Sequence, residues 1–551
     1  MNRALLAFAM AAVSTAAAAD TLVTNINGIQ VSSTGELERF TGLLIGKDGK
    51  VRSILTGPPP PKTFEHTVNG QGRTLLPGLI DAHGHVMGLG TSAIQLDLVG
   101  TVSLEDLQQR LRDYAAAHPN DPWIIGRGWN QELWLEKAFP TAADLDAAVP
   151  DRPVVLERVD GHAIVVNSAA LKAAAISAAT ADPIGGKIER AADGAPTGLL
   201  VDAAASLVKT PPLTAEQRTQ ALAEAQEALL SVGVTAAADM GTSKEDWATF
   251  TAAGDANRLR VRIMAYAFGL ENLPEKPTQW LYRDRLQMGG IKLYGDGALG
   301  SRGAWLKQPY ADKPDTRGLQ FLTDQQMRDQ ANEAARRGFQ VAIHAIGDAT
   351  NAQVISAYEE LAKKYGRDGR WRIEHFQIAD PKDIPRLAPA GIIASMQPTH
   401  QTSDRLMAEA RLGPNRLLGA YAWQSVLLSK ARLAFGSDFP VESPNPFPGL
   451  SAAVSREDMK GQPPGGWIPG ERVTFAQALN GFTRGAAYAG FAESKIGALE
   501  PGRWADFILV DRDVSDVDPQ ALARTEVLET WVAGQKVWEK RATAAQPAPA
   551  K

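Results

Sequence analysis

The 551-residue chain contains no cysteine, and this absence excludes several kinds of protein. A disulfide framework and a lipid-anchored cysteine both require a thiol. A metal site in this chain would have to use histidine, carboxylate or modified lysine, because thiolate ligands are missing. A basic surplus is also missing, since the formal net charge is -5. Without positive charge to hold a phosphate backbone, nucleic acid is not an expected partner.

Long hydrophobic runs are absent too, apart from a short one at the N-terminus. Arg3 precedes an apolar stretch at residues 5–13, and a run of small residues ends at Ala19. This pattern is typical of a secretory signal peptide over residues 1–19, which predicts a periplasmic or secreted protein. A transmembrane anchor is the alternative, but the stretch is too short and too rich in alanine to favour it. We expect a mature protein with no membrane span.

The middle of the chain alternates strand-like and helical segments, the pattern of parallel βαβ units. Helix starts are marked by Thr214, Thr323 and Thr474, each followed three residues later by glutamine, which is a capping-box pattern. Eight segments are candidate strands, and eight strands close a small parallel barrel. These segments are 75–81, 232–239, 261–267, 290–295, 340–344, 371–376, 392–397 and 432–438. The sequence therefore predicts an α/β fold with a (β/α)8 TIM barrel over residues 75–494.

The segments outside the barrel pattern indicate three further units. Residues 20–74 and 495–540 are rich in short β segments, which predicts one small β-sandwich built from both termini. The gap between the first two candidate strands is too long for a simple crossover, so we expect an inserted subdomain at about 120–210. Residues 541–551 are rich in alanine, proline and glutamine, which predicts a disordered tail.

Metal-binding side chains recur at the ends of the candidate strands. His83 and His85 follow the first strand, and alternate residues on a strand share one face, so both imidazoles can reach one metal. Alone, this pair is as easily explained by a turn after a strand. Four of the 8 histidines in the chain lie at strand ends, however, and such ends converge on one face of a parallel barrel. The later strand-end candidates are Lys292, His344, His375 and Asp438.

The order of these residues resembles the binuclear amidohydrolase superfamily. More narrowly, four motifs resemble amidohydrolase family 3, a subgroup that includes YtcJ-like and N-substituted formamide deformylase-like proteins. The motifs are Pro-Gly-Leu-Ile-Asp-Ala-His-Gly-His at 77–85, His-Ala-Ile-Gly-Asp at 344–348, Gly-Ser-Asp-Phe-Pro at 436–440 and Gly-Arg-Trp-Ala-Asp at 502–506. The similarity covers essentially the whole predicted mature chain.

The resemblance implies two divalent metal ions, which we expect to be zinc. It implies that one ion is held by His83, His85 and Asp438, and the other by His344 and His375. It also implies that Lys292 is carboxylated and that its carbamate bridges both ions. An unmodified ammonium has no lone pair and would repel two cations. The plain alternative for Lys292 is a strand-end lysine with a salt-bridge partner.

The expected reaction is hydrolysis of an amide-type, non-peptide C–N bond in a small N-acyl or N-formyl compound. A metal-activated hydroxide would attack, with Asp438 as general base and then general acid. The alternative role for Asp438 is a helix N-cap after the strand. Alternatives for the whole protein are a metallopeptidase or cyclic amidase on the same scaffold, or a non-catalytic metal-binding protein.

Further polar residues lie where loops would face the pocket, and we predict that they contact substrate. His162 lies in the insertion, where a structural, hydrogen-bonded role is equally possible. Arg302 could pair with a substrate carboxylate or remain a solvated surface residue. The predicted set is His162, Asp296, Arg302, Gln397 and His400.

Overall fold

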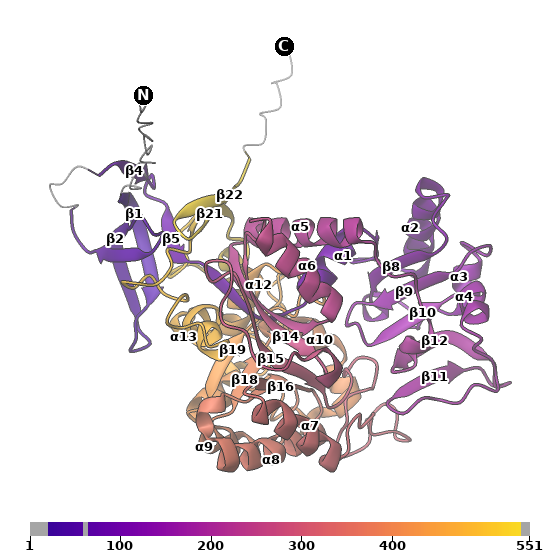
Figure 1. Cartoon of the computed structure of the whole chain (residues 1–551). Coiled ribbons are helices and arrows are strands. Elements are labelled where there is room, and N and C mark those ends of the chain that lie inside the picture. Colours follow the sequence, from indigo (N-terminus) through magenta and orange to yellow (C-terminus); the bar gives the residue numbers. More distant parts are fainter. Residues whose placement is uncertain (1–19, 59–63, 542–551) are drawn as a thin grey trace, which may run out of the picture.

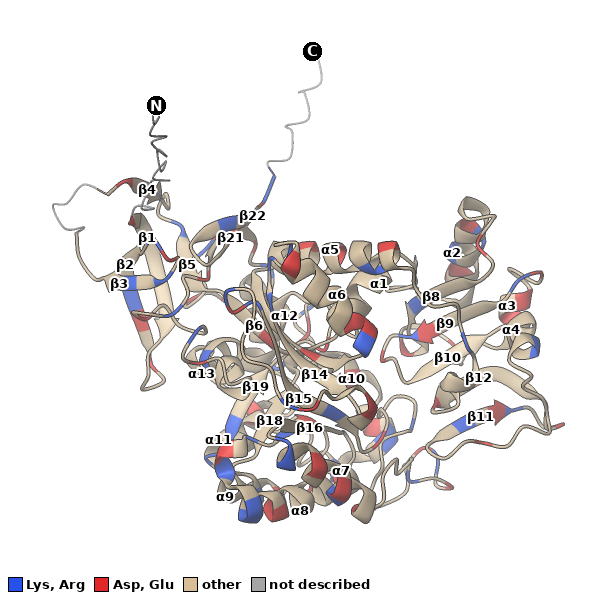
Figure 2. Cartoon of the chain, in the orientation of Figure 1, with Lys and Arg blue, Asp and Glu red and all other residues tan. Residues whose placement is uncertain are grey.

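The structure is a computed structural model that describes residues 20–58 and 64–541. The signal peptide predicted for residues 1–19, and all but the first residue of the tail predicted at 541–551, lie outside these residues. Within the described residues, no helix combines the length and the apolar character needed to cross a bilayer. Both acidic and basic residues occur along surface helices such as α7 (Asp324–Arg336) and α8 (Asp348–Tyr365) (Figure 2).

Eight parallel strands form the central sheet, in the order β19-β18-β17-β16-β15-β14-β13-β6. A parallel bridge between Gly84 and Phe439 joins the two edges of this sheet, so the barrel is nearly closed (Figure 1). The α/β barrel class is therefore confirmed. The strands are β6 (Leu79–Gly84), β13 (Val234–Thr242), β14 (Arg262–Phe268), β15 (Leu286–Tyr294), β16 (Gln340–Ala345), β17 (Arg372–His375), β18 (Ile393–Met396) and β19 (Arg432–Phe435).

Helices cover the outside of the barrel (Figure 1). Three of them, α5, α7 and α13, begin with the predicted capping boxes at Thr214, Thr323 and Thr474. The helices of this part of the chain are α1 (Val86–Ala93), α5 (Ala215–Ser231), α6 (Lys244–Asp255), α7 (Asp324–Arg336), α8 (Asp348–Tyr365), α9 (Leu387–Ala390), α10 (Pro398–Leu412), α11 (Trp423–Leu428), α12 (Pro446–Ser455), α13 (Phe475–Asn480) and α14 (Ala486–Ala489).

The first predicted strand, residues 75–81, is divided between two sheets. Its first half lies in β5 (Thr74–Pro77), which pairs with strands of the termini, and its second half begins barrel strand β6. Gly78 separates the halves, and a Cβ atom there would lie 2.3 Å from Oγ1 of Thr235. The close approach of β13 therefore requires glycine at this bend.

Strands from both ends of the chain pair in one sheet, in the order β22-β21-β20-β5-β1-β2-β3, with β4 beside β1. The indigo and yellow strands lie side by side in Figure 1. That this sheet is a two-layered sandwich remains a prediction. The elements are β1 (Thr21–Val31), β2 (Leu37–Ile45), β3 (Val51–Leu55), β4 (His66–Asn69), β20 (Phe507–Val510), α15 (Pro519–Ala523), β21 (Val527–Val532) and β22 (Gln535–Glu539).

A third sheet, ordered β11-β12-β10-β9-β8-β7, lies in the long connection between β6 and β13, beside the barrel in Figure 1. It begins at Leu96, earlier than the predicted 120, because β7 has only two residues and gives no alternating pattern. Helix α2 belongs to the same unit, since Leu107 and Leu111 share its core with Trp129 and Trp134. The elements are β7 (Leu96–Asp97), α2 (Leu104–Ala117), β8 (Ile124–Trp129), α3 (Ala142–Asp146), β9 (Val154–Arg158), β10 (Ala163–Val166), α4 (Ser168–Ala173), β11 (Gly186–Arg190) and β12 (Pro196–Asp202).

Candidate metal centre

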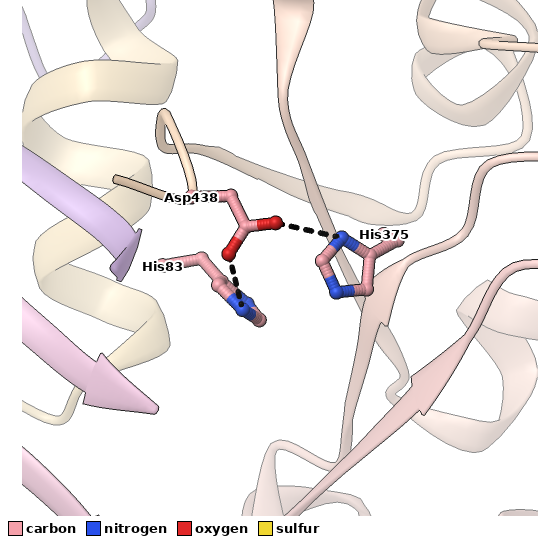
Figure 3. A group of neighbouring side chains, drawn as sticks. All are labelled: His83, His375 and Asp438. Carbon is pink, nitrogen blue, oxygen red and sulfur yellow. Dashed lines mark ion pairs between the residues drawn. The ribbon is translucent and has the colours of Figure 1, made fainter. Parts of the chain in front are cut away.

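Three ligand-type side chains meet where β6, β17 and β19 end. One ligand atom from each of His83, His375 and Asp438 lies within 4.8 Å of the others. Figure 3 shows the two imidazoles on either side of the carboxylate. Nε2 of His83 lies 3.3 Å from Oδ1 of Asp438, and Nδ1 of His375 lies 4.0 Å from Oδ2. Two histidines and one carboxylate whose ligand atoms lie this close together are a suitable donor set for a divalent transition metal.

The structure places the other three predicted ligands around this group. Nε2 of His85 lies 3.2 Å from Oδ1 of Asp438, and Nζ of Lys292 lies 3.3 Å from Nε2 of His83. The ring of His344 is 4.5 Å, centre to centre, from the ring of His375. All six predicted side chains therefore gather at one rim of the barrel, and all except that of His85 are buried.

The backbone leaves the strand conformation where the ligands project. His375 has a φ of 77° and Asp438 a φ of 62°, both in the left-handed region that such residues rarely adopt. The loop before Asp438 is held by Asp81, whose carboxylate accepts hydrogen bonds from the backbone N–H groups of His83 and Ser437. Unfavourable backbone angles persist only where surrounding contacts enforce them, and they concentrate at functional sites.

A buried ion pair fixes the orientation of His83. Its Nδ1 lies 2.6 Å from Oε2 of Glu374, and Glu374 accepts a 2.7 Å hydrogen bond from Nε of Arg372. Burial alone would raise the pKa of Glu374, but the charge of Arg372 and the contact with His83 hold it well below its usual range. The ionised carboxylate accepts a hydrogen bond from Nδ1–H, so the lone pair of Nε2 faces the ligand cluster, as in metal-binding histidines whose other ring nitrogen is held by a carboxylate.

The protonation states also suit metal binding. Burial lowers the pKa of His83, and lowers those of His344 and His375 far below the usual range, so these imidazoles are neutral and keep a lone pair. Burial likewise lowers the pKa of Lys292 to about 8. Burial would raise the pKa of Asp438, but neighbouring His83 and His85 outweigh it and hold the group ionised.

Some buried polar atoms at this rim have no hydrogen-bond partner within the described residues. They include Nε2 of His344 and Oδ1 of Asp438, both of predicted ligands. The short distances from Oδ1 of Asp438 to the two histidines do not have hydrogen-bond geometry. A buried polar atom without a partner is unfavourable by about 1–3 kcal/mol, so such atoms are rare unless a ligand or ion satisfies them. The residues present therefore fit a bound divalent metal.

A cavity with two lobes opens above this cluster, and His162, His344, His375 and Asp438 line both lobes. The α10 lobe, of about 640 Å³, extends toward residues of α10 and toward residues 440–444. The aromatic lobe, of about 820 Å³, is lined by Phe268, Tyr294 and Phe321 together with Lys292. Each lobe has the volume of a pocket for a small molecule.

Comparison with known proteins agrees with this geometry. The model of the amidohydrolase family matches residues 66–538. The chain belongs to the amidohydrolase family. It is 34% identical to a Bacillus subtilis protein that is named as an amidohydrolase, YtcJ. The match covers 87% of this chain and 91% of that protein. It is 27% identical to an N-substituted formamide deformylase of Arthrobacter pascens, over 85% of this chain and 89% of that protein.

A solved structure supports the same assignment. The crystal structure of a metal-dependent hydrolase from Pyrococcus horikoshii superimposes on this amidohydrolase with a TM-score of 0.72. The two chains are 27% identical, and the match covers 91% of this chain and 99% of that one. The fold and the metal-dependent character of this neighbour agree with a divalent metal at the cluster.

Two of the predicted substrate residues of this amidohydrolase line the cavity. Nδ1 of His162 lies 2.6 Å from Oδ1 of Asp202, and its ring lies 5.1 Å from the ring of His344. Burial alone would lower the pKa of His162, but Asp202 raises it to about 9, so the imidazole is protonated at neutral pH. Nε2 of His400 lies 3.6 Å from Oδ2 of Asp438. The inserted sheet therefore places the cationic side chain of His162 at the rim of the barrel.

The other three predicted substrate residues do not line this cavity. Asp296 is buried and accepts hydrogen bonds from backbone N–H groups of Ile346 and Gly347, so it shapes the loop after β16. Gln397 lies 2.9 Å from Nδ1 of His375 and orients that ring. Arg302 pairs with Asp312 at 2.8 Å and lines a separate cavity. In the structure these three side chains therefore make structural and positioning contacts, and a contact of any of them with substrate stays a prediction.

The carboxylates that hold His83 and His162, Glu374 and Asp202, were not predicted from the sequence. Glu374 carried a readable signal, because Arg372 and Glu374 alternate with apolar residues on β17, whereas a barrel interior usually takes apolar side chains. No sequence pattern indicated Asp202, because it lies 40 residues beyond His162 and reaches it only through the pairing of β10 with β12.

Proposed function

We propose that this amidohydrolase hydrolyses an amide-type, non-peptide C–N bond of a small N-acyl or N-formyl compound. The proposal rests mainly on one observation: neutral imidazoles and an ionised carboxylate converge on one point at the floor of a cavity. The name of the Arthrobacter relative, an N-substituted formamide deformylase, favours the same bond type.

Two groups of residues would hold the metal. His83, His85 and Asp438 would hold one divalent ion, expected to be zinc, and His344 and His375 a second. When bound, the ions would supply a hydroxide near neutral pH and positive charge for the carbonyl oxygen of the substrate. Their donor atoms are nitrogen and oxygen only, which suits zinc among the common divalent metals.

Lys292 would bridge the two ions as a carbamate. A lysine reacts with carbon dioxide only through its neutral amine, and the lowered pKa of about 8 gives this lysine a neutral fraction at physiological pH. Nζ of Lys292 lies 3.3 Å from Nε2 of His83, so a carbamate formed on this amine would lie beside the other donors. Carboxylation also removes the positive charge that would oppose metal binding.

Asp438 would transfer the proton in the reaction. Its Oδ1 lies among the ligand nitrogens without a hydrogen bond to any described residue. It can accept a proton from the attacking water and deliver it to the nitrogen of the leaving amine. The cationic His162, also on the cavity wall, would stabilise negative charge on the substrate oxygen. His400, close to Asp438, would contact the leaving group.

The function can be tested by metal analysis together with a substrate screen. Purified protein is expected to contain up to two equivalents of zinc and to hydrolyse N-formyl or N-acyl amines in preference to dipeptides and lactams. The matched control is His83→Ala, which should lose both metal and turnover. Stoichiometric metal without any hydrolysis would identify a non-catalytic metal-binding protein, and a preference for dipeptides would identify a peptidase.

A further inference from the structure

Among the carboxylates that line the α10 lobe, Asp160 and Glu132 pair with arginines and Asp97 is exposed, whereas two others are neither paired with a lysine or arginine nor used by the proposed chemistry. Asp404 lies on α10, and Glu442 lies four residues after Asp438. Both line the lobe whose floor is formed by His375, His400 and Asp438. A substrate held for reaction at the metal centre would extend one of its substituents past these two side chains.

Each of these carboxylates is fixed through one oxygen by neutral donors. Oδ2 of Asp404 accepts hydrogen bonds from the hydroxyl group of Tyr421, at 2.8 Å, and from the side-chain amide of Gln377. Oε1 of Glu442 accepts a 2.5 Å hydrogen bond from the hydroxyl group of Ser403. The remaining oxygens, Oδ1 of Asp404 and Oε2 of Glu442, have no hydrogen bond to any described residue.

The cationic side chains of the lobe are committed to other partners, including His162, which pairs with Asp202. Arg158 pairs with Asp160, and Arg127 donates hydrogen bonds to the backbone carbonyl groups of Val159 and Pro440. Within residues 20–58 and 64–541, no lysine or arginine forms an ion pair with Asp404 or Glu442. Burial raises the pKa of both carboxyl groups by more than the nearby His400 lowers it, and the charge of Asp404 adds to the rise at Glu442. Two partly satisfied carboxylates would be stabilised by a ligand that brings positive charge.

A second observation points to a ligand at the same place. The His400 residue is only 8% exposed, and its Nε2 has no hydrogen-bond partner within the described residues. It lines the same lobe, whose wall also includes the apolar side chains of Leu133, Leu406 and Met407. A ligand that extends from the metal centre to Asp404 and Glu442 could contact both this imidazole and these apolar side chains.

We propose that the α10 lobe binds a cationic group of the substrate, an ammonium or guanidinium on a short apolar chain, between the free oxygens of Asp404 and Glu442. This inference rests on the proposed function, because it assigns the substrate class of the same cavity: an acylated amine with a second, basic nitrogen group. Such a group has several N–H donors, so it can bond to both carboxylates at once.

The test measures binding of n-butylguanidinium and of its neutral isostere n-butylurea to the metal-loaded, full-length protein by calorimetry. A guanidinium has no free lone pair, so it does not bind through the metal. We expect the cation to bind at least tenfold more tightly than the urea. Asp404→Asn and Glu442→Gln should each weaken binding of the cation about tenfold to a hundredfold and leave binding of the urea unchanged.

Glu409→Gln is the matched control, since it removes one negative charge from the exposed face of the same helix and should not change either affinity. Thermal unfolding and metal content establish that each variant is folded and loaded. Equal binding of the two probes by the wild type would overturn the inference. So would unchanged binding of the cation in both variants, when both are folded.

A kinetic comparison separates this inference from the proposed function. N-formyl-1,4-diaminobutane should have a KM at least tenfold lower than that of N-formylbutylamine, and Glu442→Gln should abolish this preference without changing kcat for N-formylbutylamine. Hydrolysis of neither compound by the metal-loaded wild type would count against the proposed function. The probe binding would then still decide whether the lobe selects a cation.

Discussion

Two buried clusters of charged side chains lie at opposite ends of the barrel strands. At the N-terminal end, Arg262 of β14 forms hydrogen bonds of 2.6 and 2.9 Å with the two oxygens of Asp506, which joins the barrel to the sheet of the termini. Arg262 also donates to the backbone carbonyl of Asp284, and Asp506 accepts from the backbone N–H of Ala533. The side-chain polar atoms of this pair are satisfied.

The cluster at the C-terminal end is equally buried but is not satisfied. Asp438 and His344 each have a buried ligand atom without a hydrogen-bond partner in the described part of the chain. His375 and Asp438 also adopt left-handed backbone angles. The comparison indicates that a satisfied charge cluster serves stability, whereas an unsatisfied one marks the place that a ligand completes. Substitutions at the N-terminal end should therefore lower the stability of the protein, whereas substitutions at the C-terminal end should lower its turnover or metal affinity.

The largest effect is expected for Asp438→Asn. The amide keeps the size of the side chain but cannot accept and return a proton, so kcat should fall by about 10²- to 10⁴-fold or more. The midpoint of thermal unfolding should change little. Activity near that of the wild type would show that Asp438 does not transfer the proton.

The next largest effect is expected at the other end, for Asp506→Ala. Removing one partner of a buried ion pair leaves Arg262 uncompensated, which should lower the free energy of unfolding by about 3–5 kcal/mol. Glu539→Gln removes one carboxylate of an exposed pair with Lys536, and should change the stability by less than about 1 kcal/mol. Chemical denaturation measures both. Turnover per folded molecule should be preserved in Asp506→Ala. Loss of this turnover would contradict the conclusion that the Arg262–Asp506 pair serves stability alone.

A smaller effect is expected for Gln397→Met, which removes the hydrogen-bond partner of Nδ1 of His375 without changing charge. Loss of such a partner typically weakens metal affinity by about 10- to 100-fold. Gln401→Met is the matched control, because Gln401 is buried and its amide has no partner among the described residues. Competition with a chelator measures both affinities. Equal metal affinities in the two variants would show that Gln397 does not position His375 for metal binding.

The smallest effect is a pH dependence at Lys292. With a pKa of about 8, the neutral fraction of this amine rises about tenfold from pH 7 to pH 9. Reactivation of metal-free protein by zinc, at constant dissolved carbon dioxide, should therefore become about tenfold faster over this range and level off above it. Reactivation that is independent of carbon dioxide would exclude the carbamate.

The order of residues along the chain was enough to predict the barrel and to place six side chains together, because the ends of parallel strands must meet at one rim. His83 and Asp438 are 355 positions apart, yet the closing bridge of the barrel brings them together. Contacts that depend on loop paths were not predictable. Arg302 follows a strand as a ligand would, but its loop turns it toward Asp312.

The division of the first strand illustrates the same limit. Residues 75–81 read as one apolar segment, since the pattern of a buried strand does not show which sheet it joins. The pairing of β5 with β1 and with β20, a strand from the far end of the chain, separates Thr74–Pro77 from the barrel. The inserted sheet was likewise placed too late in the sequence, because its first strand is too short to produce a pattern.

Anomalous diffraction from crystals of the purified protein, recorded on both sides of the zinc absorption edge, tests the central claim most directly. We predict anomalous density at the cluster of His83, His375 and Asp438, with ligand atoms at about 2.0–2.2 Å from the ion. An active protein with no anomalous density at this cluster, or with its metal bound elsewhere, would contradict it.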